Sequence, residues 1–278
     1  AFMGKTILDT ASYLLFQPAD YGTSDINTTG AGPQRPITSQ PRIAFAGNNQ
    51  FWVYFGTGVY NEYDASYPYQ RFYGLIDTAS TYTDAGLVDM TLSTATNASA
   101  QSWFIQLGQN EAGCGTKCID REFTGVTDPA CVSSCTAQGS NPDCNGSCKV
   151  TQSTTKDRNE RVLNPPEVYG GFVFFGTFTP NSSPCGGGTS RFYSLTYKTG
   201  APEAGLMLNA TQQSTRSLKV SSGQGIPSNP MIFVGRTGQG QIVAAGLMNI
   251  STGELIKIDL DQHKFSELLS ILLWRQIR

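Results

Sequence analysis

Charge and histidine are both scarce in this sequence. Charged residues make up 14% of the 278 residues, and 19 basic against 21 acidic side chains give a net charge of -2. Without a basic block, a nucleic-acid-binding surface has no electrostatic basis. His263 is the only histidine, which excludes a histidine-rich zinc site. It is also the only candidate base for a Ser-His-Asp triad. We expect it at the surface, because it lies in a charged segment. We therefore predict a non-enzymatic protein that does not bind nucleic acid.

Long apolar runs and several familiar motifs are absent as well. No apolar run reaches the length of about 18 residues that a transmembrane helix needs. The first residues lack the charged start, continuous apolar centre and cleavage site of a signal peptide, so residue 1 is expected to be a processing site or a fragment boundary. The run CGGGT at 185–189 lacks the Gly-Lys-Ser/Thr of a phosphate loop, and no Cys-x-x-Cys-His haem motif is present.

Glycine and aromatic residues are abundant, and the chain contains an internal repeat. Residues 51–77 align without a gap to residues 171–197, at an offset of 120. In each copy an apolar, aromatic run ends in Gly-Thr, and a polar loop separates it from Arg-Phe-Tyr-x-Leu. The nine identical positions are Val53/Val173, Phe55/Phe175, Gly56/Gly176, Thr57/Thr177, Asn61/Asn181, Arg71/Arg191, Phe72/Phe192, Tyr73/Tyr193 and Leu75/Leu195.

The repeat predicts the fold class. Each copy has the pattern of two antiparallel strands and their connection, and the first strand is apolar at nearly every position, as expected of a strand buried on both faces. Sheets on both sides of a hairpin indicate a repetitive all-β architecture such as a β-propeller, with two similar strands of a sandwich as the alternative. We predict about ten to twelve strands, or roughly three to four blades. Residues 1–278 are accordingly predicted to form a single portion of a propeller, which ends in a helical turn and a closing strand.

Six of the seven cysteines are clustered in three Cys-x-x-x-Cys pairs. This even number in a segment without periodicity favours disulfides and an oxidising compartment, with zinc or iron–sulfur ligation as the alternative. We therefore predict a disulfide-rich insertion at 109–155, with its pairing open, and leave Cys185 either free or paired elsewhere. The disulfide candidates are Cys114, Cys118, Cys131, Cys135, Cys144 and Cys148.

Four tyrosines gather in the loop of the first repeat copy. Tyr60, Tyr63, Tyr67 and Tyr69 are flanked by short polar residues, a composition found at adaptable binding surfaces. The sequence therefore predicts a possible binding surface here, and packing against neighbouring blades is the alternative.

Several of these segments, taken in their order along the chain, resemble a known protein family. The block ERVLNPPEVYGGFVFFGTFTPNSSPCGGGTSRFYSLTYKTG, the pair WVYFGTGVY and QRFYGLID, the segment GQGIPSNPMI and the final LLWRQIR together resemble the C-terminal region of the PilY1 family of type IV pilus biogenesis and tip adhesin proteins. The resemblance implies a protein exported through the periplasm to the pilus tip or outer surface. It also implies that the protein acts with minor pilins in pilus assembly and extension, and that it attaches the cell to surfaces or host cells.

The same resemblance bears on cofactors and on the rest of the propeller. The family is calcium-dependent, but its acidic loop of alternating Asp and Asn residues does not occur in this chain, so we expect no cofactor here. The N-terminal remainder of the same protein, or a companion chain, would complete the propeller. Two alternatives stay open: a propeller of the quinoprotein dehydrogenase type, and a carbohydrate-binding propeller that uses the tyrosines.

Overall fold

The described part of the chain is all-β, as the sequence predicts. A computed structural model describes residues 2–4, 13–16, 35–47, 50–60, 63, 69–78, 80–91, 100–108, 143–144, 148–149, 159–183, 187–203, 205–208, 216–220, 225–239 and 241–265. These residues contain sixteen strands in five sheets and two short 3-10 helices, η1 (Asp84–Gly86) and η3 (Gln262–Phe265).

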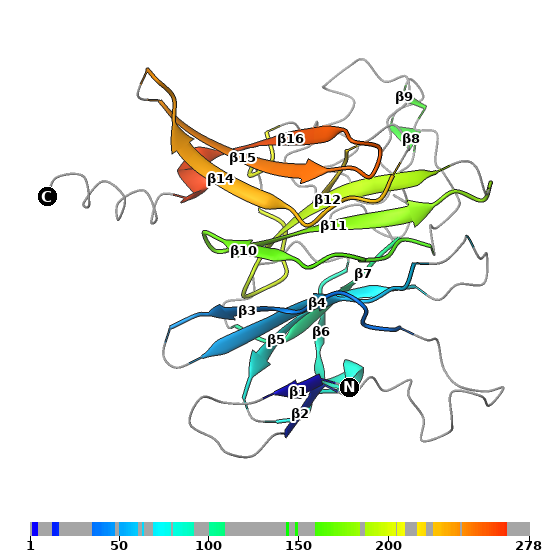
Figure 1. The fold of residues 1–278 in the computed structure, drawn as a ribbon. Coiled ribbons are helices and arrows are strands. Elements are labelled where there is room, and N and C mark those ends of the chain that lie inside the picture. The colour runs from blue at the N-terminus through cyan, green and yellow to red at the C-terminus, as the bar shows by residue number, and fades with distance from the viewer. Residues whose placement is uncertain are drawn as a thin grey trace, which may run out of the picture.

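Three of the sheets form the body of the molecule (Figure 1). The first sheet has the order β3-β4-β5-β7-β6, with a parallel β6–β7 pair and antiparallel pairs elsewhere. The second sheet, β10 to β13, and the third, β14 to β16, are antiparallel with neighbours in chain order. The strands are β3 (Arg42–Phe45), β4 (Phe51–Gly56), β5 (Arg71–Asp77), β6 (Val88–Asp89), β7 (Trp103–Gln106), β10 (Glu167–Tyr169), β11 (Phe172–Pro180), β12 (Gly188–Thr196), β13 (Ser217–Lys219), β14 (Met231–Arg236), β15 (Ile242–Asn249) and β16 (Leu255–Leu260).

Two small hairpins complete the described strands. β1 (Phe2–Gly4) pairs with β2 (Tyr13–Phe16), and β8 (Asp143–Cys144) pairs with β9 (Cys148–Lys149). The tail after residue 265 lies outside the described residues, so the predicted closing strand is not tested. The predicted helical turn corresponds in place to η3, whose Phe265 is buried.

The sequence repeat is a duplicated hairpin with one register. In the β4–β5 pair and in the β11–β12 pair, equivalent residues lie opposite each other across the two strands. Eight of the nine identical positions therefore form four opposed residue pairs in each copy. These opposed positions are Val53–Leu75 and Val173–Leu195, Phe55–Tyr73 and Phe175–Tyr193, Gly56–Phe72 and Gly176–Phe192, and Thr57–Arg71 and Thr177–Arg191.

Equivalent faces of the two copies contact equivalent neighbours. Phe55 and Tyr73 pack on Phe16 of β2, the layer that precedes the first sheet. Their counterparts in the second sheet, Phe175 and Tyr193, pack on the first sheet. The Phe175 ring is stacked on Phe72, with ring centroids 3.8 Å apart. The repeat therefore encodes the stacking of one sheet on the preceding sheet as well as the hairpin itself.

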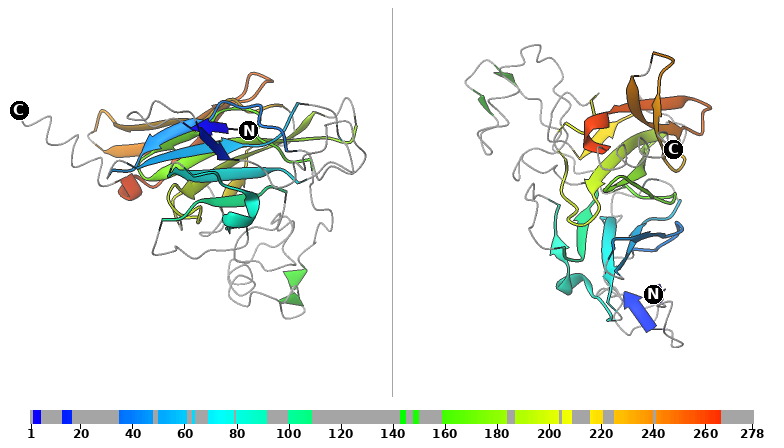
Figure 2. Two further views of the ribbon diagram at one scale, coloured as in Figure 1. Left: turned by 90° about the horizontal axis from the view of Figure 1, so that it is seen from below. Right: turned by 90° about the vertical axis from the view of Figure 1, so that its left-hand side faces the viewer.

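The same order continues to the third sheet. Phe174 and Phe192, on the opposite face of the second sheet, pack with Ala244, Met248 and Ile258 of the third. Figures 1 and 2 show the resulting layers, from β1–β2 through the first and second sheets to the third. The central hairpins are thus buried on both faces, as their apolar sequences predict.

The described residues form an open stack, and no closed propeller is detected among them. The face of the third sheet that points away from the second carries exposed Met231 and Phe233 of β14 and exposed Leu255 of β16. The all-β prediction is therefore confirmed, whereas the propeller prediction is not.

The repeated glycines allow the sheets to approach closely. A Cβ at Gly56 would overlap the Val162 side chain between the first two sheets. At the equivalent Gly176, a Cβ would lie 3.0 Å from the flexible Met248 Sδ, between the second and third sheets. We expect Gly56→Ala to lower the free energy of unfolding by about 2 kcal/mol in urea denaturation, and Gly176→Ala to cost less. An equal or larger loss for Gly176→Ala would contradict this ranking.

Candidate functional site

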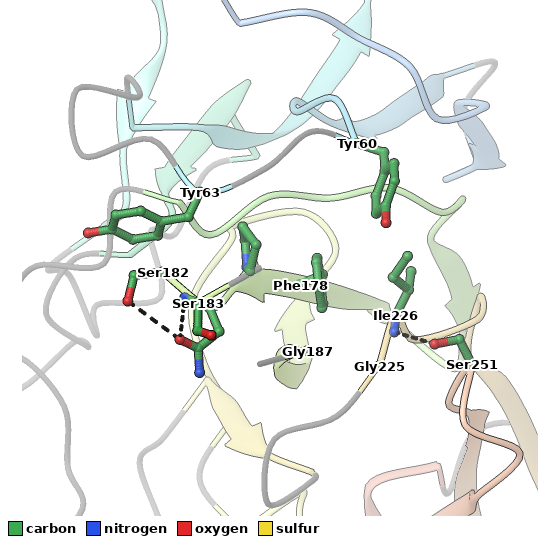
Figure 3. A pocket seen from close by; sticks show the side chains of 11 residues that line it. Tyr60, Tyr63, Phe178, Ser182, Ser183, Gly187, Gly225, Ile226 and Ser251 are labelled. Carbon is green, nitrogen blue, oxygen red and sulfur yellow. Dashed lines mark hydrogen bonds between the residues drawn. The ribbon is translucent and has the colours of Figure 1, made fainter. Parts of the chain in front are cut away.

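Loops from all three sheets meet around one cavity at the end where β4 and β11 terminate (Figure 3). Its volume is about 390 Å³, within the roughly 300–1,000 Å³ common for small-ligand sites. The β4–β5 loop, the β11–β12 loop, the segment before β14 and the β15–β16 turn all contribute. The lining residues are Tyr60, Tyr63, Phe178, Pro180, Asn181, Ser182, Ser183, Gly187, Gly225, Ile226 and Ser251.

Aromatic and apolar side chains form one part of the lining. Tyr60 and Tyr63 follow β4 and are 70% and 42% exposed. Phe178 is buried at the end of β11, where its backbone N–H and C=O both pair with Arg161. In Figure 3, Tyr60 points toward Ile226, which is half-buried. The cavity thus combines a buried aromatic ring with two tyrosine rings open to solvent.

Hydrogen bonds stabilise the loops on the side of the cavity opposite the tyrosines. The Asn181 N–H donates to the Gly187 carbonyl at 2.9 Å and closes the β11–β12 hairpin. The Ile226 N–H donates to Ser251 Oγ, and the Ser251 N–H donates to the Ile226 carbonyl, both at 2.9 Å. The hydroxyl of Ser190 donates to the Gly225 carbonyl at 2.6 Å. These bonds join the loops of the second and third sheets.

The glycine in that wall has a conformational role. Gly225 has φ of +136°, a value that residues with a side chain rarely adopt, and an added Cβ would lie 2.5 Å from Ile250 Cγ2. Glycine therefore allows the segment before β14 to approach the β15–β16 turn at this point.

The polar groups among the described lining residues are neutral. Asn181 Oδ1 accepts from the Ser183 N–H at 3.0 Å and lies 3.5 Å from Ser182 Oγ. This arrangement fixes the side-chain amide with its Nδ2 donors directed away from that turn. None of the described lining residues is Asp, Glu, Lys, Arg or His. These described residues can hold a ligand through hydrogen bonds and ring contacts.

The structure brings together two of the four tyrosines predicted as a binding surface. Tyr60 and Tyr63 line the cavity, whereas Tyr69 does not. Tyr69 lies directly before β5, its hydroxyl oxygen is inaccessible to solvent, and its carbonyl accepts a hydrogen bond from Arg35 Nε at 2.9 Å. Tyr67 lies outside the described residues. The sequence analysis missed Asn181 and Ser251, although the loop of the second repeat copy was a signal for the former.

The disulfide candidates remain largely untested. Cys144 and Cys148 occupy opposed positions of the β8–β9 pair. The other candidates, Cys114, Cys118, Cys131 and Cys135, lie outside the described residues, as does Cys185.

The described residues reveal neither a metal cluster nor a membrane-spanning helix. No group of three or more His, Cys, Asp or Glu side chains in this part of the chain is arranged to hold a metal ion. No described helix is both long and apolar enough to cross a bilayer. His263 is exposed on η3, and its backbone N–H donates to Asp261 Oδ1 at 2.9 Å.

The repeated tyrosine of each copy donates to a carboxylate that lies outside the copy, half-buried in the case of Asp84 and buried in the case of Glu160. Tyr73 donates to Asp84 Oδ1 at 2.9 Å, and Asp84 forms an ion pair with Arg71 at 2.9 Å. Tyr193 donates to Glu160 Oε1 at 2.8 Å. Because protein groups surround both carboxylates and neither lines the cavity, we interpret them as structural.

Burial raises the pKa of two core tyrosines, Tyr54 and Tyr73, above the ordinary value, and the adjacent Asp84 carboxylate raises that of Tyr73 further. Below about pH 10, both are protonated in the folded and the unfolded chain. At higher pH the unfolded chain loses these protons first, so the free energy of unfolding should fall as pH rises above about 10. Tyrosinate absorbance at alkaline pH measures this. Titration of all 12 tyrosines near pH 10 in the folded protein would contradict it.

The comparisons with known proteins give no further identification. No family model matches the chain, no curated protein matches its sequence, and no solved structure matches its fold.

Proposed function

We propose that this chain is a non-enzymatic part of a type IV pilus tip protein of the PilY1 type, which supports pilus assembly and extension and attaches the cell to surfaces or hosts. The observation that carries the attachment role is the cavity at the loop end of three stacked sheets, with exposed tyrosines among its described lining residues. A rigid scaffold that presents variable loops is a common arrangement for binding proteins. The pilus assignment comes from the sequence resemblance.

We further propose that the three sheets are successive blades of a propeller. Equivalent faces of the two repeat copies pack on the layer before them, which is the relation expected between neighbouring blades. The exposed apolar side chains Met231, Phe233 and Leu255 on the third sheet support a further layer. The N-terminal remainder of the same protein, or a companion chain, would supply it.

The insertion at 109–155 is proposed as a second contact surface held by disulfides. The described residues that flank it lie close together, because the Gly108 N–H donates to Glu160 Oε2 at 2.6 Å. An insertion between residues that lie close together can be shortened without opening the scaffold. Residues 156–158 would remain as the link between them.

Removal of residues 109–155 tests the role of the insertion in attachment. We expect the shortened protein to retain a cooperative unfolding transition within a few degrees of the parent Tm, since the sheets keep their contacts. Bacteria that carry this deletion in the full-length protein should attach to surfaces several-fold less well at equal surface levels of the protein. Unaltered attachment would contradict the role of the insertion. Minor pilins should co-purify with both forms, because the scaffold is preserved.

A further inference from the structure

We infer that the cavity at the loop end binds a neutral saccharide. This inference names the ligand class of the proposed attachment site, so it rests on the proposed function. It depends on three properties of the described lining: exposed tyrosine rings, available hydrogen-bond donors, and the lack of ionisable side chains.

The tyrosine rings provide flat apolar surfaces. Tyr60 is 70% exposed although it carries a large ring, and neither Tyr60 nor Tyr63 makes a ring contact with another described residue. The C–H face of a sugar ring is apolar and can lie against such a surface, where contact removes both from water. The buried Phe178 ring and half-buried Ile226 extend this apolar area into the cavity.

Hydrogen-bond donors surround these rings. Asn181 Oδ1 is occupied by the Ser183 N–H, and among the described residues its Nδ2 group has no partner. Ser251 Oγ accepts from the Ile226 N–H, which leaves its hydroxyl hydrogen available to a ligand. Sugar hydroxyls both donate and accept, so they satisfy amide and hydroxyl groups of this kind.

The described lining residues carry no charge, which favours neutral saccharides over acidic ones. Sialylated or sulfated glycans carry an anion that proteins commonly bind through arginine or lysine. The described lining contains neither, and it also contains no carboxylate that would attract a basic peptide. A ligand with hydroxyl groups and no net charge places no unpaired charge against these described residues.

Hydrogen bonds hold the residues that present Asn181 and Ser251. The Asn181 N–H donates to the Gly187 carbonyl, and the Ile226 N–H donates to Ser251 Oγ, both at 2.9 Å. Polar groups held in this way lose less conformational entropy on binding than free ones. The cavity volume of about 390 Å³ is near the lower end of the usual range and suits the terminal units of a glycan.

The test is binding of the purified chain to immobilised glycans. The set contains neutral glycans that end in glucose, galactose, mannose or N-acetylhexosamine, and acidic glycans that are sialylated or sulfated. We expect binding to at least one neutral class. Tyr60→Ala and Asn181→Asp should each weaken it by about tenfold or more, whereas Tyr60→Phe should retain it because the ring remains. Phe233→Ala is the matched control, since Phe233 is 52% exposed on the third sheet outside the cavity.

Three results would overturn the inference: no binding to any neutral glycan, binding to acidic glycans alone, or neutral binding that Tyr60→Ala and Asn181→Asp leave unchanged. Unfolding curves of each variant exclude loss of the fold as the cause. The proposed pilus function is scored separately, through attachment of whole bacteria. If glycan binding fails while attachment still depends on the protein, the saccharide inference is wrong and the proposed function stands.

Discussion

Replacement of Trp103 by alanine should lower the free energy of unfolding by about 3–5 kcal/mol. Trp103 lies on β7 and is 1% exposed. Its indole fills space left by two glycines, because a Cβ on Gly74 or Gly200 would lie 2.5 Å from the ring. Its Nε1 donates to the Tyr197 carbonyl at 3.2 Å, which joins the first sheet to the turn after β12. The variant therefore loses a large packed ring and a hydrogen bond at once.

Urea denaturation measures this loss, with Phe233→Ala as the control for removal of a mostly exposed ring. We expect the control to change the free energy of unfolding by no more than about 0.5 kcal/mol. A loss below about 1 kcal/mol for Trp103→Ala would mean that Trp103 does not connect the first two sheets as described.

The second large effect is expected at Glu160. This side chain is 4% exposed, and its two oxygens accept from the Gly108 N–H at 2.6 Å, the Thr177 hydroxyl at 2.6 Å and the Tyr193 hydroxyl at 2.8 Å. Glu160→Ala leaves these donors without their acceptor in the interior. We expect a loss of about 3 kcal/mol or more in the free energy of unfolding, since each buried unpaired group costs about 1–3 kcal/mol.

Two milder variants separate the individual bonds. Tyr193→Phe removes one donor and should cost about 1 kcal/mol. Glu160→Gln retains one acceptor oxygen but sets an N–H₂ group against an N–H or O–H donor, so its cost should lie between those of the other two variants. If Glu160→Ala were no more destabilising than Tyr193→Phe, the carboxylate would not be the shared acceptor of this network.

The hairpins of the scaffold could be predicted from the sequence because their signals are local. Apolar runs such as Phe51–Gly56 indicate strands buried on both faces, and the offset of 120 links residues that share a register. Short strands such as β10 (Glu167–Tyr169) give little periodic signal, since their position depends on pairing with β11. Whether the sheets close into a ring does not follow from the hairpins, because the hairpin pattern does not specify how many sheets pack together.

Half of the candidate site could be predicted in the same way. The tyrosine-rich loop indicated Tyr60 and Tyr63, whereas the equally indicated Tyr69 lies outside the cavity, half-buried directly before β5. Asn181 and Ser251 belong to common residue types far apart in the chain. Only the stacking of the three sheets brings them to one cavity.

Labelling of intact pili tests the proposed function most directly. Antibodies raised against this chain, applied to bacteria that encode it and viewed by electron microscopy, should label the ends of type IV pili. Bacteria that lack the encoding gene should bear fewer pili and attach less well, and the intact gene should restore both. Label that is absent from pilus ends, together with normal piliation and attachment in the deletion strain, would contradict the account.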